Sequence, residues 1–180
     1  IGKHYPNCKI TAVSNSAPQR EFITAVAREK GLDNVNVVTS DMNDFTPTGT
    51  FDRVVSVEMF EHMRNYRALF ERIHRWLRDD GLFLMLLRPH RSTPYEFVDR
   101  GPGDWMSRHF FSGGMMPSDD LPLWCQQRLR LVRRWRWDGR HYQRTANAWL
   151  ENIDARRDEA RAVLAPVYGE KNVQQWIQRW

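Results

Sequence analysis

The sequence has few cysteines and no long hydrophobic run, and both absences narrow the class of protein. Its 180 residues include only two cysteines, Cys8 and Cys125, which lie far apart in the chain. This spacing gives neither a disulfide framework nor a zinc-binding pair, so it favours a reducing, cytoplasmic setting and no metal site. The longest apolar run, residues 82–87, is much shorter than the roughly 18 residues that a membrane-spanning helix needs.

The beginning of the chain also lacks two common features. It has no initiator methionine, and its first residues do not show the charged-then-apolar pattern of a signal peptide. We therefore expect a piece of a longer chain. The hydrophobic content of 41% and the charged content of 27% are typical of a globular protein. At this length, the expectation is one partial domain over residues 1–180.

Positive charge is concentrated in one stretch of the chain. The net charge is +5, and residues 128–144 hold seven arginines but only one acid, Asp138. Such a stretch could bind nucleic acid or an anionic lipid surface, or it could be one solvated face. Residues 128–137 alternate basic and apolar side chains with one slip at 132–134. This pattern predicts a bulged strand with one basic face, for which nucleic-acid binding is the less favoured interpretation.

The first half of the chain alternates strand and helix patterns. β-favouring runs at 9–13, 35–38, 51–57 and 82–87 are separated by amphipathic helices at 17–30 and 65–79. This order is typical of βαβ units and of an open parallel sheet, whose strand at 82–87 should be buried on both faces. The second helix has an apolar stripe of Leu69, Phe70, Ile73, Trp76 and Leu77.

The middle of the chain, residues 89–127, differs from the first half in amino-acid composition. It mixes glycines and prolines with aromatic residues, and it ends in a short predicted helix from 118 to 124. So long a loop with so much apolar material is typical of a functional lid, so we interpret it as a substrate-side insertion. A long helix is predicted from 140 to 164.

Three polar side chains follow the predicted strand at 51–57. Glu58, Glu61 and His62 would lie on one side of a helical turn, next to the sheet edge where ligands bind in open α/β folds. A carboxylate beside an imidazole is a plausible acid–base pair near neutral pH. The alternative is a helix-capping glutamate and a surface histidine.

Residues 57–66, VEMFEHMRNY, resemble the segment after the fourth strand of S-adenosylmethionine-dependent methyltransferases. The likeness is to the branch that joins cyclopropane-fatty-acyl-phospholipid synthases to coclaurine-type N-methyltransferases. Residues 10–20, 105–120 and 139–145 are similar to other segments of that family in the same order. The resemblance implies an α/β fold of the Rossmann-like class I methyltransferase type. It also implies an open sheet that is incomplete at both ends, because the family's first strand with its glycine-rich turn and its last strand are not in the chain.

The resemblance assigns cofactor-binding roles after three strands. Ser14 and Gln19 would bond the ribose hydroxyls, with Asn15 in the same turn, although simple helix capping is the alternative for this segment. After the next strand, the family places Asp41, Met42 and Asn43 around the adenine. It also places Val57, at the end of the strand at 51–57, next to the cofactor.

The resemblance also implies the acceptor site. Glu58, Glu61 and His62 would line the pocket, and Tyr142 would reach in from the late helix. In the cyclopropane synthases the counterparts of Glu61 and Tyr142 hold a bicarbonate that removes a proton. In the N-methyltransferases the glutamates and the histidine orient and deprotonate an amine. This sequence has Leu86 where the family usually has a pocket histidine. Either His90 replaces that histidine or the binding of bicarbonate is lost.

The function implied is transfer of a methyl group from S-adenosylmethionine to a small amine. Cyclopropanation or C-methylation of unsaturated phospholipid acyl chains is the alternative within the family, and it would bring peripheral contact with an anionic membrane. A basic module that binds nucleic acid or lipid and an inactive fragment are the alternatives of another class. The sequence predicts no oligomeric state.

Overall fold

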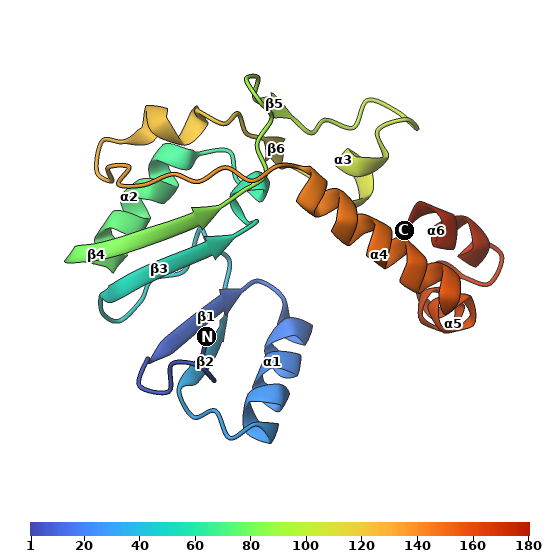
Figure 1. The fold of residues 1–180 in the computed structure, drawn as a ribbon, viewed down its shortest axis with the longest axis horizontal. Helices are drawn as coiled ribbons and strands as arrows, with labels where there is room; N and C mark the ends of the chain where they lie inside the picture. The colour runs from blue at the N-terminus through green and yellow to red at the C-terminus, as the bar shows by residue number, and fades with distance from the viewer. The chain divides into compact units, whose positions relative to one another are not determined.

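The computed structural model describes residues 1–180, which divide into two compact units. Residues 1–130 form the first, with all the strands and the helices α1 to α3; residues 131–180 form the second, with α4 to α6 (Figure 1). Each is described by itself, and the expectation of a single domain stays a prediction. None of the helices has the length and apolar character to cross a membrane.

The first βαβ unit forms where the sequence predicts it. Strands β1 (Ile10–Ser14) and β2 (Val35–Thr39) pair in parallel, with α1 (Ala17–Glu29) between them in the chain. The helix begins at Ser16, whose hydroxyl accepts a hydrogen bond from the main-chain N–H of Gln19. It ends before Gly31, whose φ of +60° is easily reached only without a side chain.

The second βαβ unit is also parallel. Strand β3 (Phe51–Val57) pairs with β4 (Leu77–Leu86), and α2 (Tyr66–Trp76) connects them. The predicted helix at 65–79 is therefore too long, because Leu77 already has an extended backbone and belongs to the strand. Its main-chain N–H still bonds the last turn of α2 and closes the helix there.

The core of the first unit is the interface between α2 and the β3–β4 pair. All five residues of the predicted stripe are buried, with Ile73 2% exposed. Phe60 is fully buried and meets the rings of Tyr66 and Phe70 edge-on at 5.1 and 5.7 Å between centroids. Edge-to-face contacts of this kind add to the stability that burial itself gives. The core therefore fixes the segment that links β3 to α2, which includes Glu58, Glu61 and His62.

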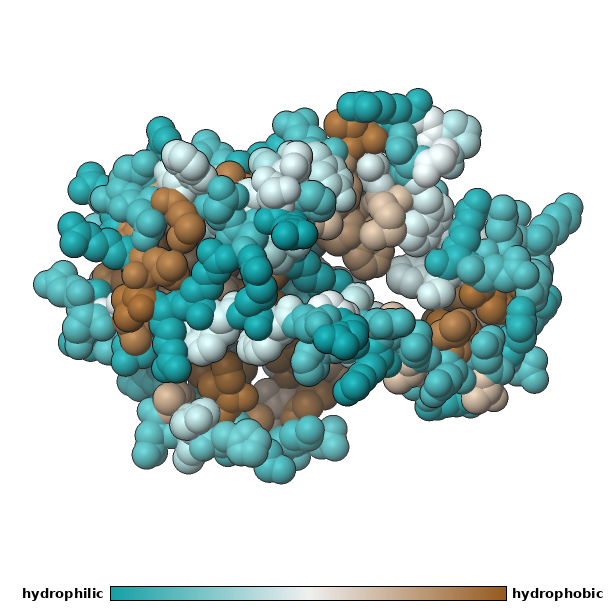
Figure 2. Space-filling view, turned by 45° about the horizontal axis from the view of Figure 1, so that its top comes forward, coloured by the Kyte–Doolittle hydropathy of each residue, from teal (hydrophilic) through white to brown (hydrophobic).

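The other face of β3 and β4 is exposed, so the prediction of a strand buried on both faces is wrong. Val55, Val57, Leu82 and Leu84 are each about half exposed or more, because α2 covers one face and no other helix packs on this one. No hydrogen-bonded ladder joins the β1–β2 pair to the β3–β4 pair. Figure 2 shows apolar residues opening to the surface in patches between hydrophilic ones.

The substrate-side segment, residues 89–127, contains one short pair of antiparallel strands. Strands β5 (Tyr95–Glu96) and β6 (Met115–Met116) pair antiparallel, with α3 (Trp105–His109) between them. The predicted helix at 118–124 is a 3₁₀ helix, η2 (Leu121–Cys125), with Pro122 in its first turn. Within the first unit, β6 contacts the 3₁₀ turn η1 (Phe60–His62) and η2 contacts α2.

The end of the chain differs from two predictions. Residues 128–137 form no strand, because alternation creates two faces but a strand also needs a neighbour to bond with. The predicted helix at 140–164 is two helices, α4 (Arg140–Ala155) and α5 (Arg157–Tyr168), since Arg156 leaves the helical backbone region. A third, α6 (Val173–Arg179), packs on α5. The mixed α/β class with parallel βαβ units is confirmed.

Candidate functional site

The first part of the site lies where β1 and β2 end. The carbonyl of Ser14 accepts a hydrogen bond from the N–H of Ser40, which holds the two strand ends side by side. The Ser14 hydroxyl donates to Oε1 of Gln19 at 2.7 Å, while Asn15 is exposed in the turn between them. The structure therefore brings Ser14 and Gln19 together, beyond the helix capping that Ser16 provides.

The turn after β2 is ordered by its own side chains. Oδ1 of Asp41 accepts hydrogen bonds from the main-chain N–H of Asn43 at 2.7 Å and from its side-chain amide at 2.8 Å. Met42 packs against the core between these two residues. This arrangement presents one apolar and one amide side chain at the same edge, which suits an aromatic base with polar substituents.

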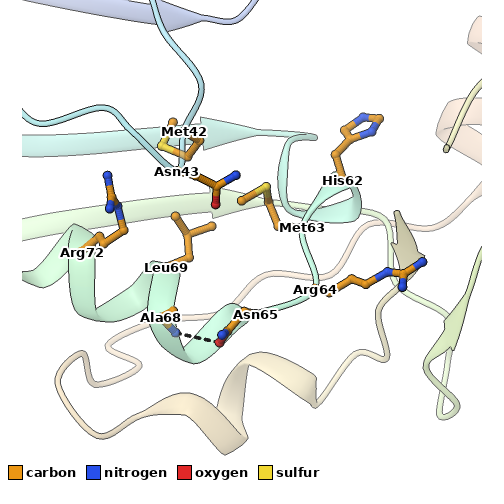
Figure 3. Close-up of a pocket in the computed structure, with 9 residues that line it drawn as sticks. All are labelled: Met42, Asn43, His62, Met63, Arg64, Asn65, Ala68, Leu69 and Arg72. Atoms are coloured by element: carbon orange, nitrogen blue, oxygen red, sulfur yellow. Dashed lines mark hydrogen bonds between the residues drawn. The ribbon is translucent and has the colours of Figure 1, made fainter. Parts of the chain in front are cut away.

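A cavity of about 280 Å³ connects this turn to the segment after β3. Figure 3 shows Met42 and Asn43 on one side of it and residues of the β3–α2 connection and of α2 on the other. Asn65 caps α2 by accepting a hydrogen bond from the N–H of Ala68 at 3.0 Å. The full lining is Met42, Asn43, His62, Met63, Arg64, Asn65, Ala68, Leu69 and Arg72. The cavity therefore joins the predicted adenine residues to one predicted acceptor residue.

Glu58 lies directly beyond β3 in an unusual conformation. Its φ is +52°, a value that is uncommon outside glycine, and its N–H bonds the carbonyl of Leu86 at 2.9 Å. The expectation of one helical turn over 58–62 is thus wrong, because helical geometry begins only at η1 (Phe60–His62). Both carboxylate oxygens of Glu58 are instead bonded by the guanidinium of Arg88, just beyond β4.

Glu61 is the most buried charged residue of the site, with 4% of its surface exposed. Its Oε1 accepts a hydrogen bond from the main-chain N–H of Arg88 at 2.7 Å. Its Oε2 is buried without a hydrogen-bond partner. Because an unsatisfied buried carboxylate oxygen costs free energy, Oε2 is a hydrogen-bond acceptor that no side chain or main-chain group of the protein uses.

Tyr66 supports this environment from the first turn of α2. Its hydroxyl donates to the carbonyl of Phe60 at 3.0 Å. Burial raises the pKa of the Tyr66 phenol well above its ordinary value, and the negative charge of Glu61 raises it further. The phenol therefore stays protonated and acts as a fixed hydrogen-bond donor to the η1 backbone.

His62 meets the substrate-side segment. Its imidazole stacks on Phe111 with 5.3 Å between ring centroids, and Phe111 stacks on Phe97 at 4.7 Å. Tyr95 continues this aromatic row at 5.7 Å from Phe97. An aromatic wall next to the imidazole suits an acceptor that is flat or cationic, since ring faces attract both.

Gly114 allows the close approach of that segment. A Cβ atom at this position would lie 2.5 Å from the carbonyl oxygen of Glu61, which is closer than real Cβ contacts allow. The N–H of Gly114 also bonds the carbonyl of Phe111 at 3.0 Å. Because position 114 has no side chain, the substrate-side segment can approach Glu61 closely enough for Phe111 to stack on His62.

The other predicted residues have different surroundings. Val57 ends β3 and is 60% exposed. Leu86 is half-buried, and Nδ1 of His90 accepts the N–H groups of its own turn, from Ser92 and Thr93. Tyr142 lies on α4 in the second unit, with its ring edge-on to Trp149, and its part in the acceptor site stays a prediction. No cluster of three His, Cys, Asp or Glu side chains is arranged to hold a metal.

Sequence reasoning missed three residues of the site. Arg88 carried a signal, because a cation directly after an apolar strand lies at the ligand-binding edge. Phe111 and Gly114 lie inside the predicted insertion of residues 89–127, which gives neither of them an individual role. The contacts of Phe111 with His62 and of Gly114 with Glu61 join segments about fifty residues apart, which periodicity does not reveal.

The fold and the candidate site define a class: an α/β protein whose candidate ligand-binding turns follow parallel strands. The chain belongs to the mycolic acid cyclopropane synthetase family, whose model matches residues 3–178. It is 33% identical over 172 residues to (S)-coclaurine N-methyltransferase of Thalictrum flavum subsp. glaucum, covering 94% of this chain and 48% of that protein. It is 30% identical over 164 residues to cyclopropane-fatty-acyl-phospholipid synthase of Escherichia coli K12, covering 90% of this chain and 39% of that protein.

A solved structure gives the same picture. The crystal structure of coclaurine N-methyltransferase bound to N-methylheliamine and SAH matches with a TM-score of 0.89 and 32% sequence identity. The match covers 98% of this chain and 52% of that one. The Rossmann-like class I methyltransferase fold is therefore established, and the chain spans about half the length of the N-methyltransferases that it matches.

Proposed function

We propose that the protein transfers a methyl group from S-adenosylmethionine to the nitrogen of a small amine. The observation that carries this proposal is Oε2 of Glu61, a buried carboxylate oxygen that lacks a hydrogen-bond partner. An amine nitrogen that approaches Oε2 could donate its hydrogen there. The similarity to coclaurine N-methyltransferase over 94% of the chain supports the same reaction class.

The residues at the ends of β1 and β2 fit the proposed cofactor. Ser14 and Gln19 already bond each other and could take up two ribose hydroxyls, with Asn15 beside them. Met42 and Asn43 line the 280 Å³ cavity and offer an apolar surface and an amide to the adenine, while Asp41 holds their turn. The bound cofactor supplies an electrophilic methyl group on a sulfonium sulfur.

The remaining task of the protein is to orient the amine and accept its proton. Glu61 would accept a hydrogen bond from the protonated amine through Oε2 and take that proton, which frees the nitrogen lone pair to accept the methyl group. His62 would contact the acceptor from the same turn, fixed in place by its stacking on Phe111. The aromatic row would exclude water and favour the approach of a cationic or flat acceptor. A role for Tyr142 in acceptor binding is proposed from the family resemblance alone.

Bicarbonate is not part of the proposal, because the surroundings of Glu61 do not fit it. Leu86 is apolar, and the guanidinium of Arg88 is bonded to Glu58. His90 uses Nδ1 within its own turn, so it does not replace the family's histidine as an acceptor through that atom.

Action on phospholipid acyl chains is the second candidate. It is supported by the 30% identity to the cyclopropane synthase and by the segment 131–137, where Trp135 and Trp137 are more than half exposed among arginines. Trp and Arg together are suited to the headgroup region of an anionic membrane.

Two free cysteines, one of them exposed, are in keeping with the proposed cytoplasmic setting.

The test has two stages on the full-length gene product. Calorimetric titration with S-adenosylhomocysteine should show binding, and methyl transfer should then be assayed on (S)-coclaurine, other secondary amines, and vesicles of unsaturated anionic phospholipid. Turnover of amines supports the main proposal, and turnover of vesicles alone supports the second candidate. The absence of any binding would show the methyltransferase proposal to be wrong, and binding without turnover of any acceptor would indicate an inactive protein. Steep salt dependence of binding to DNA would instead point to a nucleic-acid module.

The role of Glu61 is tested with one substitution and one control. Glu61→Gln should lower kcat/KM for the amine by about 100-fold or more, since a general base is lost, while the Kd for S-adenosylhomocysteine changes by less than about twofold. Glu29→Gln, at an exposed position on α1, should leave both unchanged. An unaltered rate in Glu61→Gln would contradict the proposed role.

A further inference from the structure

Arg88 bonds both candidate glutamates, each in a different way. Its guanidinium donates from Nε to Oε1 of Glu58 at 3.0 Å and from Nη2 to Oε2 of the same carboxylate. Its main-chain N–H donates to Oε1 of Glu61 at 2.7 Å. The planar fork of an arginine matches the two oxygens of a carboxylate, so the first contact is a directional ion pair.

The two glutamates are therefore not equivalent. Glu58 has both oxygens bonded to one cation, and its side chain is 40% exposed. Glu61 is 4% exposed and keeps Oε2 without a partner. The side-chain charges of Glu58 and Arg88 cancel, so the group formed by Glu58, Arg88 and Glu61 carries one negative charge.

We infer that Arg88 is a positioning residue that determines specificity: it neutralises Glu58, so that Glu61 is the one carboxylate the acceptor meets and the site selects acceptors with a single positive charge. The inference rests on the proposed amine methylation. The left-handed backbone of Glu58 supports it, because such a conformation persists only when the surroundings hold it. The ion pair with Arg88 and the main-chain bond to Leu86 are two contacts that do so.

The kinetic test uses a double-mutant cycle at Arg88 and Glu58. Simple amines are cations at neutral pH, so the charge of the site acts directly on their KM. Arg88→Ala leaves Glu58 uncompensated and should lower the KM of a monoamine acceptor by about three- to fivefold. Glu58→Gln removes one negative charge from the site and should raise the KM by a similar factor. The double variant restores the net charge and should return KM to within about twofold of the parent.

Two controls separate charge from structure. Arg91→Ala removes an exposed arginine three residues away and should change neither KM nor kcat. Arg88→Lys keeps the charge but not the planar fork, so it should keep KM near the parent value while kcat falls. The acceptor is the amine of the panel above that turns over fastest. A purely structural role predicts that both single variants impair the enzyme in the same direction, and that result would overturn the inference.

A second measurement does not depend on turnover. Thermal unfolding of the parent, Arg88→Ala, Glu58→Gln and the double variant should show coupling: each single variant lowers Tm, and the double lowers it no further than the larger single loss. Additive losses of Tm would show that Arg88 and Glu58 do not interact, even if methyl transfer is observed. Coupling without any methyl transfer would leave the pair in place and show that the proposed function is wrong. The two failures are thus distinguishable.

Discussion

The imidazole of His62 stacks on the ring of Phe111, with 5.3 Å between centroids and 30° between the planes. His62 follows β3 and Phe111 lies in the substrate-side segment, so this contact fastens the lid to the candidate acceptor site. It also gives the exposed imidazole of His62 an aromatic ring to pack on.

Removal of the ring at 111 should weaken acceptor binding. Phe111→Ala takes away the stacking surface of His62 and Phe97, so KM for the amine should rise about three- to tenfold, as expected for lost aromatic contacts. The Kd for S-adenosylhomocysteine should stay within about twofold. Phe22→Ala, on an exposed face of α1, is the matched control and should change neither value. An equal rise in the KM of both variants would argue against a specific contact.

Position 114 should not accept a side chain. Gly114→Ala places a methyl group 2.5 Å from the carbonyl oxygen of Glu61, so the free energy of unfolding should fall by about 1–3 kcal/mol. Gly103→Ala meets no atom within 4 Å and serves as the matched control, with an unchanged or slightly raised free energy of unfolding. Urea denaturation of both variants measures the difference. Equal stability of the two would contradict the close approach.

Gln19 and Ser16 lie on the same turn but should affect different properties. Gln19→Ala removes a proposed ribose partner, and it should raise the Kd for S-adenosylhomocysteine about fivefold, the effect of roughly 1 kcal/mol. Ser16→Ala removes the N-cap of α1, so it should lower the free energy of unfolding by about 1 kcal/mol with little change in Kd. Calorimetry and denaturation together separate the two. The reverse pattern would assign the turn to capping alone.

The two cysteines should react at very different rates. Burial raises the pKa of the Cys125 thiol, so this thiol stays protonated at neutral pH, whereas Cys8 is exposed. Labelling with a thiol reagent should modify Cys8 first, and Cys125 should react only at higher pH or on unfolding. Cys8→Ser should abolish the fast phase.

A raised pKa in the fold also means that any stability from the protonated Cys125 thiol is present below the pKa of the unfolded state. That stability is lost as pH rises through the pKa of the folded state.

Local patterns in the sequence determined much of the first unit. The apolar stripe of α2, the Ser16 cap and the parallel strands follow from spacing and side-chain chemistry over fewer than about twenty residues. The same patterns failed where an element depends on a distant neighbour. Residues 128–137 alternate like a strand but have no strand to bond with, and the face of Leu82 and Leu84 stays exposed because no helix packs on it.

The sequence by itself placed Glu58, Glu61 and His62 after a parallel strand and Ser14, Gln19 and Asn43 after two others. Only the tertiary structure decided how these side chains differ. Glu61 is buried with one oxygen unpartnered, while Glu58 is bonded to Arg88 from thirty residues away. Hydrogen-bond geometry and burial depend on atoms that the fold brings together, and no spacing within one segment encodes them.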